Sequence, residues 1–346
     1  MPPASSLVLD PVPDLEVELR QLIQQIPKGQ VTTYGRLAAA LGDTAASRWV
    51  GEFARHHTHS AGCACHRIVL ANGELGGYVT GHPEEKQVRL VAEGVVVERG
   101  RVAAPATPFD RFVSNFPLAA LRRQQSACAA QAIVRPLPPQ LTRVGGIDVS
   151  FSEGKAFVTL VCLGERETPE WHVTMVQTVR FPYVSGYLAF RELPLAIDLL
   201  QTVAEEFELP PVLLVDGSGM LHPRRCGIAT MLGVYASIPT IGITKKLLCG
   251  AVDEATLAQR GTASVVWEGQ PLGTAARMRG RSRRPIYVSP GHQADVVSAF
   301  ACARSFWGKR RLPAPIYWAD HLSRQWARSQ PAAAPGSLWT GTGGSI

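Results

Sequence analysis

Three acidic residues, far apart in the chain, lie in or beside predicted strands and a predicted helix, where their carboxylates could act together. Asp148 lies inside the apolar run RVGGIDVSF, Asp216 ends the apolar run VLLVD, and Glu192 lies near the start of a helical pattern over 188–207. Carboxylates gathered on a basic protein favour hard divalent cations, Mg²⁺ or Mn²⁺. Two such ions can stabilise the attacking and the leaving oxygen of a phosphodiester. We therefore expect Asp148, Glu192 and Asp216 to bind metal ions, and we expect no organic cofactor.

The elements that position these residues follow one another in a defined order. RVGGIDVSF, AFVTLVCL and WHVTMVQTVRFP are rich in β-branched and aromatic residues and are separated by polar turns, which predicts an antiparallel meander. A helix, the strand VLLVD, a helix over 225–236 and the strand TIGIT follow. The order β-β-β-α-β-α-β places the three carboxylates so that they can meet at one edge of one sheet.

Four segments of this region also match a known family. FPYVSGYLAFRELP, LLVDGSGMLHPRRCGIA, IPTIGITKKLLCG and YVSPGH occur in this order. They resemble the motifs of endonuclease V, the deoxyinosine 3′-endonuclease with an RNase H-like fold, over about residues 109–326. The resemblance implies an α/β domain with a mixed sheet. It also implies that DNA is nicked at the second phosphodiester bond 3′ of a deaminated base, chiefly hypoxanthine, with Mg²⁺ and water.

The same resemblance implies roles for individual residues. His292 would belong to the metal and catalytic shell with the three carboxylates, and Lys245 would be the cation near the scissile phosphate or the attacking water. Tyr183 would be the wedge that fills the gap when the damaged base leaves the stack. The expected pocket for that base contains Gly217, Gly219, Leu221 and His222. Taken singly, these residues also have plain structural readings, such as a turn former at a strand end or a solvated lysine.

The N-terminal region carries a helix-turn-helix pattern and a reactive thiol. TTYGRLAAALG and DTAASRWVGEFARHH predict two short helices across a tight glycine turn. Further on, Cys65 directly precedes His66. A thiol with a pKa near 8.5 is a poor nucleophile until a neighbouring base removes its proton, so this adjacency favours an activated cysteine over a structural one.

Residues 15–103 resemble the O6-alkylguanine-DNA alkyltransferase domain and its alkyltransferase-like relatives, with the PCHR core present as ACHR. The resemblance implies an α-rich winged helix-turn-helix domain. It implies the following roles: Cys65 as alkyl acceptor, His66 as the relay that deprotonates it through water, Glu93 as the carboxylate that orients the histidine, Tyr34 and Arg48 as the groups that rotate the nucleotide out and replace it, and Tyr78 as part of the pocket wall.

Departures from that family leave two alternatives open. Ala64 replaces the proline of the motif, His57 stands where the family usually has asparagine, and Val79 where it has serine. The domain is then either an alkyl acceptor or a lesion sensor that binds without transfer. A zinc site is a further interpretation, although the spacing matches no familiar paired knuckle. Its candidate ligands, all within eleven residues, are His56, His57, His59, Cys63, Cys65 and His66.

The whole chain sets the remaining expectations. Its 346 residues suit two domains, predicted at 12–103 and 116–327 with a link over 104–115 and a disordered tail over 328–346. A net charge of +7 suits a polyanionic partner, and the basic run RMRGRSRRP over 277–285 is expected to contact phosphates.

Other features bound the class of protein. The sequence contains no apolar run of eighteen residues, and its N-terminus lacks the layout of a signal peptide. Seven scattered cysteines favour a reducing compartment. We therefore expect a monomeric, cytoplasmic DNA repair protein that acts on damaged DNA, double- or single-stranded, and not on a membrane. A ribonuclease for inosine-containing RNA and a regulator whose cysteine senses methylation are the alternatives.

Overall fold

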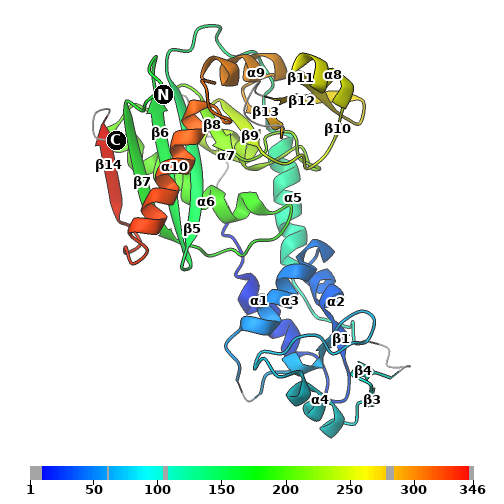
Figure 1. Cartoon of the computed structure of the whole chain (residues 1–346). Coiled ribbons are helices and arrows are strands. Elements are labelled where there is room, and N and C mark those ends of the chain that lie inside the picture. The colour runs from blue at the N-terminus through cyan, green and yellow to red at the C-terminus, as the bar shows by residue number, and fades with distance from the viewer. Residues whose placement is uncertain (1–9, 61, 104–107, 278–283, 343–346) are drawn as a thin grey trace. The chain divides into compact units, whose positions relative to one another are not determined.

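The computed structural model describes residues 10–60, 62–103, 108–277 and 284–342 (Figure 1). The chain forms two compact units. One contains Val12–Arg123 together with Arg180–Tyr187, and the other contains Gln124–Val179 and the chain from Leu188 onward. The expected two-domain architecture is therefore confirmed.

Short helices build the N-terminal unit around a small apolar core. They are α1 Leu15–Gln24, α2 Tyr34–Ala40, α3 Ser47–His56 and α4 Pro83–Ala92, with the 3-10 turns η1 Thr44–Ala46 and η2 Cys65–Arg67. Strand β1 Thr32–Thr33 pairs in parallel with β2 Ile68–Val69, and β3 Val97–Glu98 forms a hairpin with β4 Arg101–Val102. Helices α2 and α3 are the expected helix-turn-helix, and the β3–β4 hairpin is the wing.

The segment expected to link the domains is bonded to this unit where the structure describes it. The backbone N–H of Phe109 donates to Val31 O at 2.6 Å, and that of Val113 donates to Gln25 Oε1 at 2.7 Å. These bonds tie residues 108–113 to the helical unit as part of its fold.

A ten-stranded mixed sheet forms the centre of the C-terminal unit. Its order is β10-β11-β12-β13-β9-β8-β5-β6-β7-β14, in which β8 is parallel to β5 and β9 and the other neighbours are antiparallel. The strands are β5 Val144–Ser152, β6 Lys155–Leu163, β7 Trp171–Thr178, β8 Leu213–Asp216, β9 Thr240–Thr244, β10 Ala251–Val252, β11 Thr262–Trp267, β12 Gln270–Ala276, β13 Ile286–His292 and β14 Leu338–Thr342.

The helices of the C-terminal unit are α5 Pro117–Ala129, α6 Leu188–Glu206, α7 Ile228–Ala236, α8 Glu254–Arg260, α9 Val296–Ser305 and α10 Ala314–Ser329. Helix α5 begins before the boundary between the two units. The chain order β5-β6-β7-α6-β8-α7-β9 is the one predicted from the sequence. The chain end, expected to be disordered, instead adds β14 to the sheet as an antiparallel neighbour of β7.

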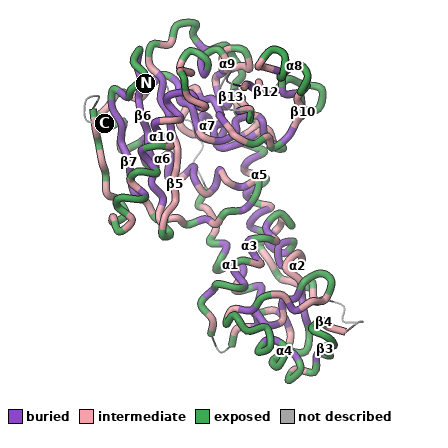
Figure 2. Tube along the Cα trace, viewed as in Figure 1, coloured by how far each residue is buried: buried purple, intermediate pink, exposed green. Residues whose placement is uncertain are grey.

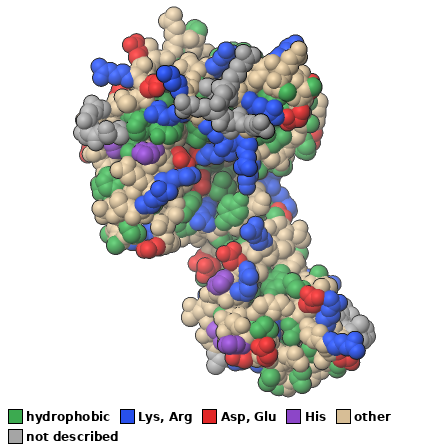
Figure 3. All heavy atoms as spheres, in the orientation of Figure 1, with side chains coloured by type: hydrophobic (Ala, Val, Ile, Leu, Met, Phe, Trp, Pro, Cys, Tyr) green, Lys and Arg blue, Asp and Glu red, His purple; other side chains and the backbone are tan. Residues whose placement is uncertain are grey.

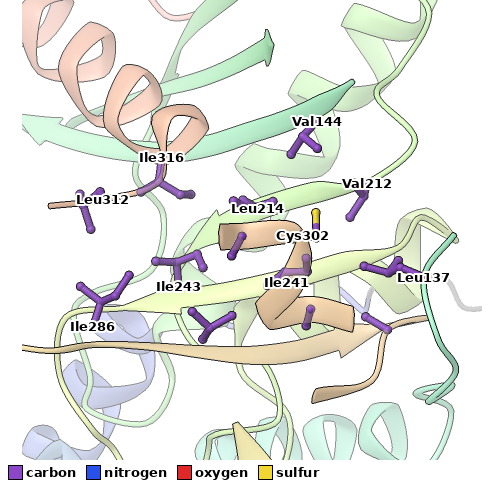
Figure 4. Close-up of a cluster of buried hydrophobic side chains, with 14 residues drawn as sticks. Leu137, Val144, Val212, Leu214, Ile241, Ile243, Ile286, Cys302, Leu312 and Ile316 are labelled. Carbon is purple, nitrogen blue, oxygen red and sulfur yellow. The ribbon is translucent and has the colours of Figure 1, made fainter. Parts of the chain in front are cut away.

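Apolar side chains fix how the helices dock on the sheet. The central strands are buried along most of their length (Figure 2). Val144 of β5, Leu214 of β8 and Ile241 of β9 pack with Cys302 of α9 and Ile316 of α10 in one buried cluster (Figure 4). Burial of such side chains contributes about 1.5–3 kcal/mol each, so this cluster holds α10 against β5.

None of the helices that the structure describes has the length and apolar composition needed to cross a bilayer.

Candidate active sites

A carboxylate cluster lies where β5 and β8 run side by side. Ile147 pairs with Val215 in the parallel ladder, so the next residues, Asp148 and Asp216, are neighbours. Carboxylate oxygens of Asp148, Asp216 and Asp320 all lie within 4.8 Å of one another. The register of two parallel strands therefore brings together two of the residues expected from the sequence, and a third comes from elsewhere.

Asp320 is that third residue, and it was not among the residues predicted from the sequence. Helix α10 crosses β5 at Gly146, where a Cβ atom would lie 2.3 Å from the carbonyl oxygen of Pro315. Ser323, one turn beyond Asp320, donates a hydrogen bond to Asp148 Oδ2 at 2.9 Å. The available signal was helical spacing, since Asp320 lies three residues before Ser323 and four after Ile316, both of which are buried.

Two cations border the cluster. Lys245 Nζ lies 2.7 Å from Asp216 Oδ2 and 3.6 Å from Asp320 Oδ1. Arg324 lies 2.9 Å from Asp320 Oδ1. Burial opposes the charge on Lys245, but Asp216 and Asp320 outweigh it and raise the pKa of its ammonium group. Lys245 is therefore held cationic beside the carboxylates, and its role near the scissile phosphate stays a prediction.

The carboxyl groups repel one another and are poorly solvated. Burial, followed by the charge of Asp216, raises the pKa of Asp148 to about 7. Glu192 on α6 is buried, and burial together with Asp148 and Asp216 raises its pKa well above the ordinary value. A divalent cation would relieve this repulsion, and oxygen ligands of this kind suit Mg²⁺ or Mn²⁺.

His292 does not join the cluster, contrary to our expectation. Strand β13 runs antiparallel to β9, with His292 opposite Thr240, whereas Asp216 of β8 pairs with Ile243 of the same strand. Three residues of a strand span about 10 Å, so His292 lies toward the other end of the sheet. Its Nδ1 accepts a hydrogen bond from the backbone N–H of Ile133 at 3.2 Å.

The residues expected to read the base have different surroundings. Tyr183 is 61% exposed, as a wedge requires. Gly217 and Gly219 form the turn after β8, which lies so close to the neighbouring strands that a Cβ on Gly219 would be 2.2 Å from Pro290 O. His222 is buried beside this turn. Leu221 is fully buried in an apolar cluster and is a core residue here, so it has no surface to offer a base.

In the N-terminal unit, the thiol of Cys65 lies in a buried pocket. Cys65 is 2% exposed, and its Sγ lies 3.5 Å from His59 Nδ1. The pairing of β1 with β2 places Tyr34, the first residue of α2, near this pocket. Burial raises the pKa of the Tyr34 phenol, with a smaller contribution from the nearby Cys65. Arg48 is exposed at the start of α3. Among the described residues, His59 Nε2, His66 Nδ1 and Tyr78 Oη are buried without a hydrogen-bond partner.

His66 is held by Glu93, the carboxylate that the resemblance to alkyltransferases implies as its partner. His66 Nε2 lies 3.0 Å from Glu93 Oε1, and Arg67 donates to both oxygens of the same carboxylate at 2.8 and 2.6 Å. These bonds from Arg67 are the main reason that the pKa of Glu93 falls to about 2. Burial lowers the pKa of His66, so its imidazole is neutral and can accept a proton.

A second group of residues in the same pocket has the chemistry of a metal site. One ligand atom from each of His57, His59, Cys63 and Cys65 lies within 4.8 Å of the others. Cys63 and Cys65 share a hydrogen bond that lowers the pKa of the Cys63 thiol and raises that of Cys65. The other two candidates from the sequence are outside the group, since His56 is exposed and His66 is bonded to Glu93.

Most of the basic run expected to contact phosphates, residues 278–283, lies outside the residues that the structure describes.

Both halves of the chain match known families. The profile of endonuclease V matches residues 126–321, and that of the 6-O-methylguanine DNA methyltransferase DNA-binding domain matches residues 14–95. A protein of Picrophilus torridus named bifunctional methyltransferase/endonuclease is 33% identical over 300 residues, which are 87% of this chain and 92% of that protein. The chain belongs to the endonuclease V family.

Solved structures of endonuclease V agree with this assignment. Human endonuclease V superimposes with a TM-score of 0.57 at 33% identity and covers 62% of this chain and 100% of its own. The enzyme of Ciona intestinalis, in complex with a 24mer DNA containing an inosine followed by a ribo-adenosine, has a TM-score of 0.57 at 28% identity and covers 61% of this chain and 98% of its own. The protein is thus an endonuclease V with a methyltransferase-like domain, as expected from the motifs.

Proposed function

We propose that the endonuclease V unit nicks DNA at the second phosphodiester bond 3′ of a deaminated base, chiefly hypoxanthine, and that the methyltransferase-like unit binds O6-alkylguanine and accepts its alkyl group on Cys65. The observation that supports the nuclease most strongly is the meeting of Asp148, Asp216 and Asp320 within 4.8 Å beside Lys245. DNA is the proposed substrate because the Ciona intestinalis relative was solved with inosine-containing DNA.

The carboxylates fit Mg²⁺ or Mn²⁺ by charge and by ligand type. All are oxygen donors, and burial together with neighbouring carboxylates raises the pKa of Asp148 and of Glu192, so a divalent cation would stabilise the ionised forms of these two. Asp148, Asp216 and Asp320 would hold the ion, with Glu192 as a further carboxylate. When bound, such an ion lowers the pKa of water and neutralises charge on the phosphoryl oxygens.

The remaining residues position the nucleic acid. Lys245 holds Asp216 and Asp320 in place and offers a cation to the scissile phosphate. A cavity of about 460 Å³ beside Asp320 is lined by Arg324 and Arg328, which can contact phosphates of the strand. Lys and Arg side chains also gather on this face of the endonuclease V unit (Figure 3).

Base recognition requires the damaged nucleotide to leave the stack. Tyr183 offers an exposed ring to fill the gap, and stacking on such a ring contributes about 1–3 kcal/mol. Gly217, Gly219 and His222 form the proposed pocket for the extruded base.

In the methyltransferase-like unit, His66 acts as the base for Cys65. The neutral imidazole, oriented by Glu93, removes the thiol proton through a water molecule. The thiolate then attacks the alkyl carbon, an S–C bond forms as the C–O6 bond breaks, and the proton passes to the guanine. The unpartnered polar atoms of His59 and Tyr78 are available to the extruded base. The departures His57 and Val79 make binding without transfer the second candidate.

One set of incubations tests both proposals. A hypoxanthine duplex and an O6-methylguanine duplex with labelled methyl are each mixed with the protein, with and without Mg²⁺. We expect a nick 3′ of hypoxanthine only with Mg²⁺, lost in Asp148→Ala, and label on the wild type but not on Cys65→Ser. Metal-dependent nicking by Asp148→Ala would contradict the site assignment. Retained duplex binding without label on the wild type would favour the sensor. An inosine-containing RNA at equal salt shows whether DNA is the preferred substrate.

A further inference from the structure

We propose that the methyltransferase-like unit binds one zinc ion through His57, His59, Cys63 and Cys65, a site separate from the carboxylate cluster. The four residues come from one short stretch, with the spacing His-x-His-x₃-Cys-x-Cys. The site includes the proposed alkyl acceptor, so it extends the function proposed for this unit.

The ligand geometry matches a tetrahedral zinc site. His57 Nε2 lies 3.3 Å from Cys63 Sγ, and His59 Nδ1 lies 3.5 Å from Cys65 Sγ. Zinc bonds of about 2.3 Å to sulfur and 2.0–2.1 Å to nitrogen give a tetrahedron with N–S edges of about 3.5 Å. The two measured edges are close to this length, and all four atoms lie within 4.8 Å of one another. Only a small inward movement of side chains is needed to close the site.

His57 already has the surroundings of a metal ligand. Its Nδ1 lies 3.0 Å from the carbonyl oxygen of Phe53, to which it donates a hydrogen bond. When His57 is neutral, the proton on Nδ1 leaves the lone pair on Nε2, which faces Cys63. Histidine ligands in proteins are commonly fixed in this way, with the second ring nitrogen bonded to a backbone carbonyl. The ring of His57 also stacks on Phe53 with a centroid distance of 5.1 Å, which further restricts its orientation.

Charge and burial favour a soft cation over an open hydrogen-bond network. His57 and Cys65 are buried, and His59 and Cys63 are partly buried. Two thiolates and two neutral imidazoles balance the charge of Zn²⁺, so the complex carries no net charge into the buried pocket. Thiolate and imidazole ligands select zinc over Mg²⁺, which prefers oxygen. Since metal ligands must be deprotonated, the bound ion, in place of His66, would keep the Cys65 sulfur as a thiolate.

The test is metal content of the full-length protein. The chain is purified under reducing conditions, exchanged through a weak chelator and measured for zinc per chain by mass spectrometry. We expect about one zinc per chain, and a loss of about tenfold or more in affinity for His59→Ala and for Cys63→Ser. His56→Ala is the matched control, because His56 is an exposed histidine one residue outside the ligand set.

Two further measurements identify the ligands. Asp148→Ala should keep its zinc, since the carboxylates belong to the other unit. The Co²⁺-substituted protein should show a thiolate-to-cobalt charge-transfer band that is absent from Cys63→Ser. Unchanged circular dichroism would show that the variants remain folded. Zinc-free wild-type protein, with both thiols of the pocket open to a thiol reagent, would overturn the proposal. Methyl transfer is scored separately, so zinc binding without transfer, or transfer without zinc, tells the two proposals apart.

Discussion

Replacing Asp320 by asparagine tests the residue that the structure added to the nuclease site. Asparagine keeps the shape and one oxygen but removes the charge. An ion equidistant from oxygens that are within 4.8 Å of one another lies no more than about 2.8 Å from each. A unit charge at that distance attracts a divalent ion by about 3 kcal/mol even with the dielectric constant of water. We therefore expect the substitution to weaken Mg²⁺-dependent nicking by about 100-fold.

The same substitution should leave the metal-free fold almost unchanged. Asp320 is repelled by Asp148 and Asp216, but it is attracted by Lys245 at 3.6 Å and Arg324 at 2.9 Å. The repulsion and the attraction oppose each other, and Asp320 is partly exposed to solvent. The free energy of unfolding without metal should therefore change by less than about 1 kcal/mol.

The assay is single-turnover nicking of a hypoxanthine duplex across a series of Mg²⁺ concentrations, with urea unfolding in a chelator as the measure of stability. Glu206→Gln, an exposed acid on α6, is the matched control and should behave as the wild type. Nicking within about threefold of the wild type by folded Asp320→Asn would refute the assignment of this carboxylate to the metal centre.

Three other substitutions test particular contacts. His292→Ala should cost about 1 kcal/mol in urea unfolding, because the partly buried Ile133 N–H loses its acceptor, and the folded variant should still nick. Lost nicking with an intact fold would show that His292 takes part in the reaction. Tyr183→Ala should weaken nicking of a hypoxanthine duplex about tenfold, and nicking of a single strand much less. Stability should be unchanged, because Tyr183 is 61% exposed. Equal losses on both substrates would argue against a wedge. Glu93→Gln should destabilise the protein at pH 7 by about 1–3 kcal/mol through weakened bonds to Arg67. Because the pKa of folded Glu93 is lowered from 4.5 to about 2, the ionised carboxylate stabilises the fold above about pH 4.5 and less as the pH falls toward 2. The difference between wild type and Glu93→Gln should therefore shrink at pH 3, and a constant difference in urea unfolding at both pH values would contradict this origin of the stability.

The sheet and its two aspartates could be predicted because both depend on local pattern. Apolar runs defined β5 and β8, and parallel neighbours in an α/β unit place equivalent positions side by side. The neighbouring positions of Asp148 and Asp216 in the sheet then follow from their places in those apolar runs. Glu192 lies near the start of α6 as expected, but it is not in the group of carboxylates within 4.8 Å of one another, and its metal-binding role stays a prediction.

Asp320 could not be predicted in the same way, because its position depends on packing between distant segments. Nothing near Asp320 in the chain says which strand α10 will cross. That crossing is set by Gly146, which has no side chain to hold the helix away, and by the bond from Ser323 to Asp148. A side chain at Gly146 would move α10, and Asp320 with it.

His292 was misplaced for a related reason. The sequence shows that a strand ends at His292 but not the direction in which that strand runs. An antiparallel strand places its carboxyl end at the amino end of its neighbour, here opposite Thr240 of β9. Motifs that occur in the right order along the chain therefore do not establish that their residues meet in space.

The two proposed metal centres of this chain differ in the chemistry of their ligands. Carboxylate oxygens of Asp148, Asp216 and Asp320 suit a hard ion that exchanges water readily, as phosphodiester cleavage requires. Thiolates and imidazoles of the methyltransferase-like unit suit a soft ion that binds firmly, as a structural site requires. A chelator at low concentration should then strip the carboxylates first and leave the zinc in place, so loss of nicking and loss of zinc should occur at different chelator concentrations. Their loss at one concentration would mean that the two centres are not chemically distinct.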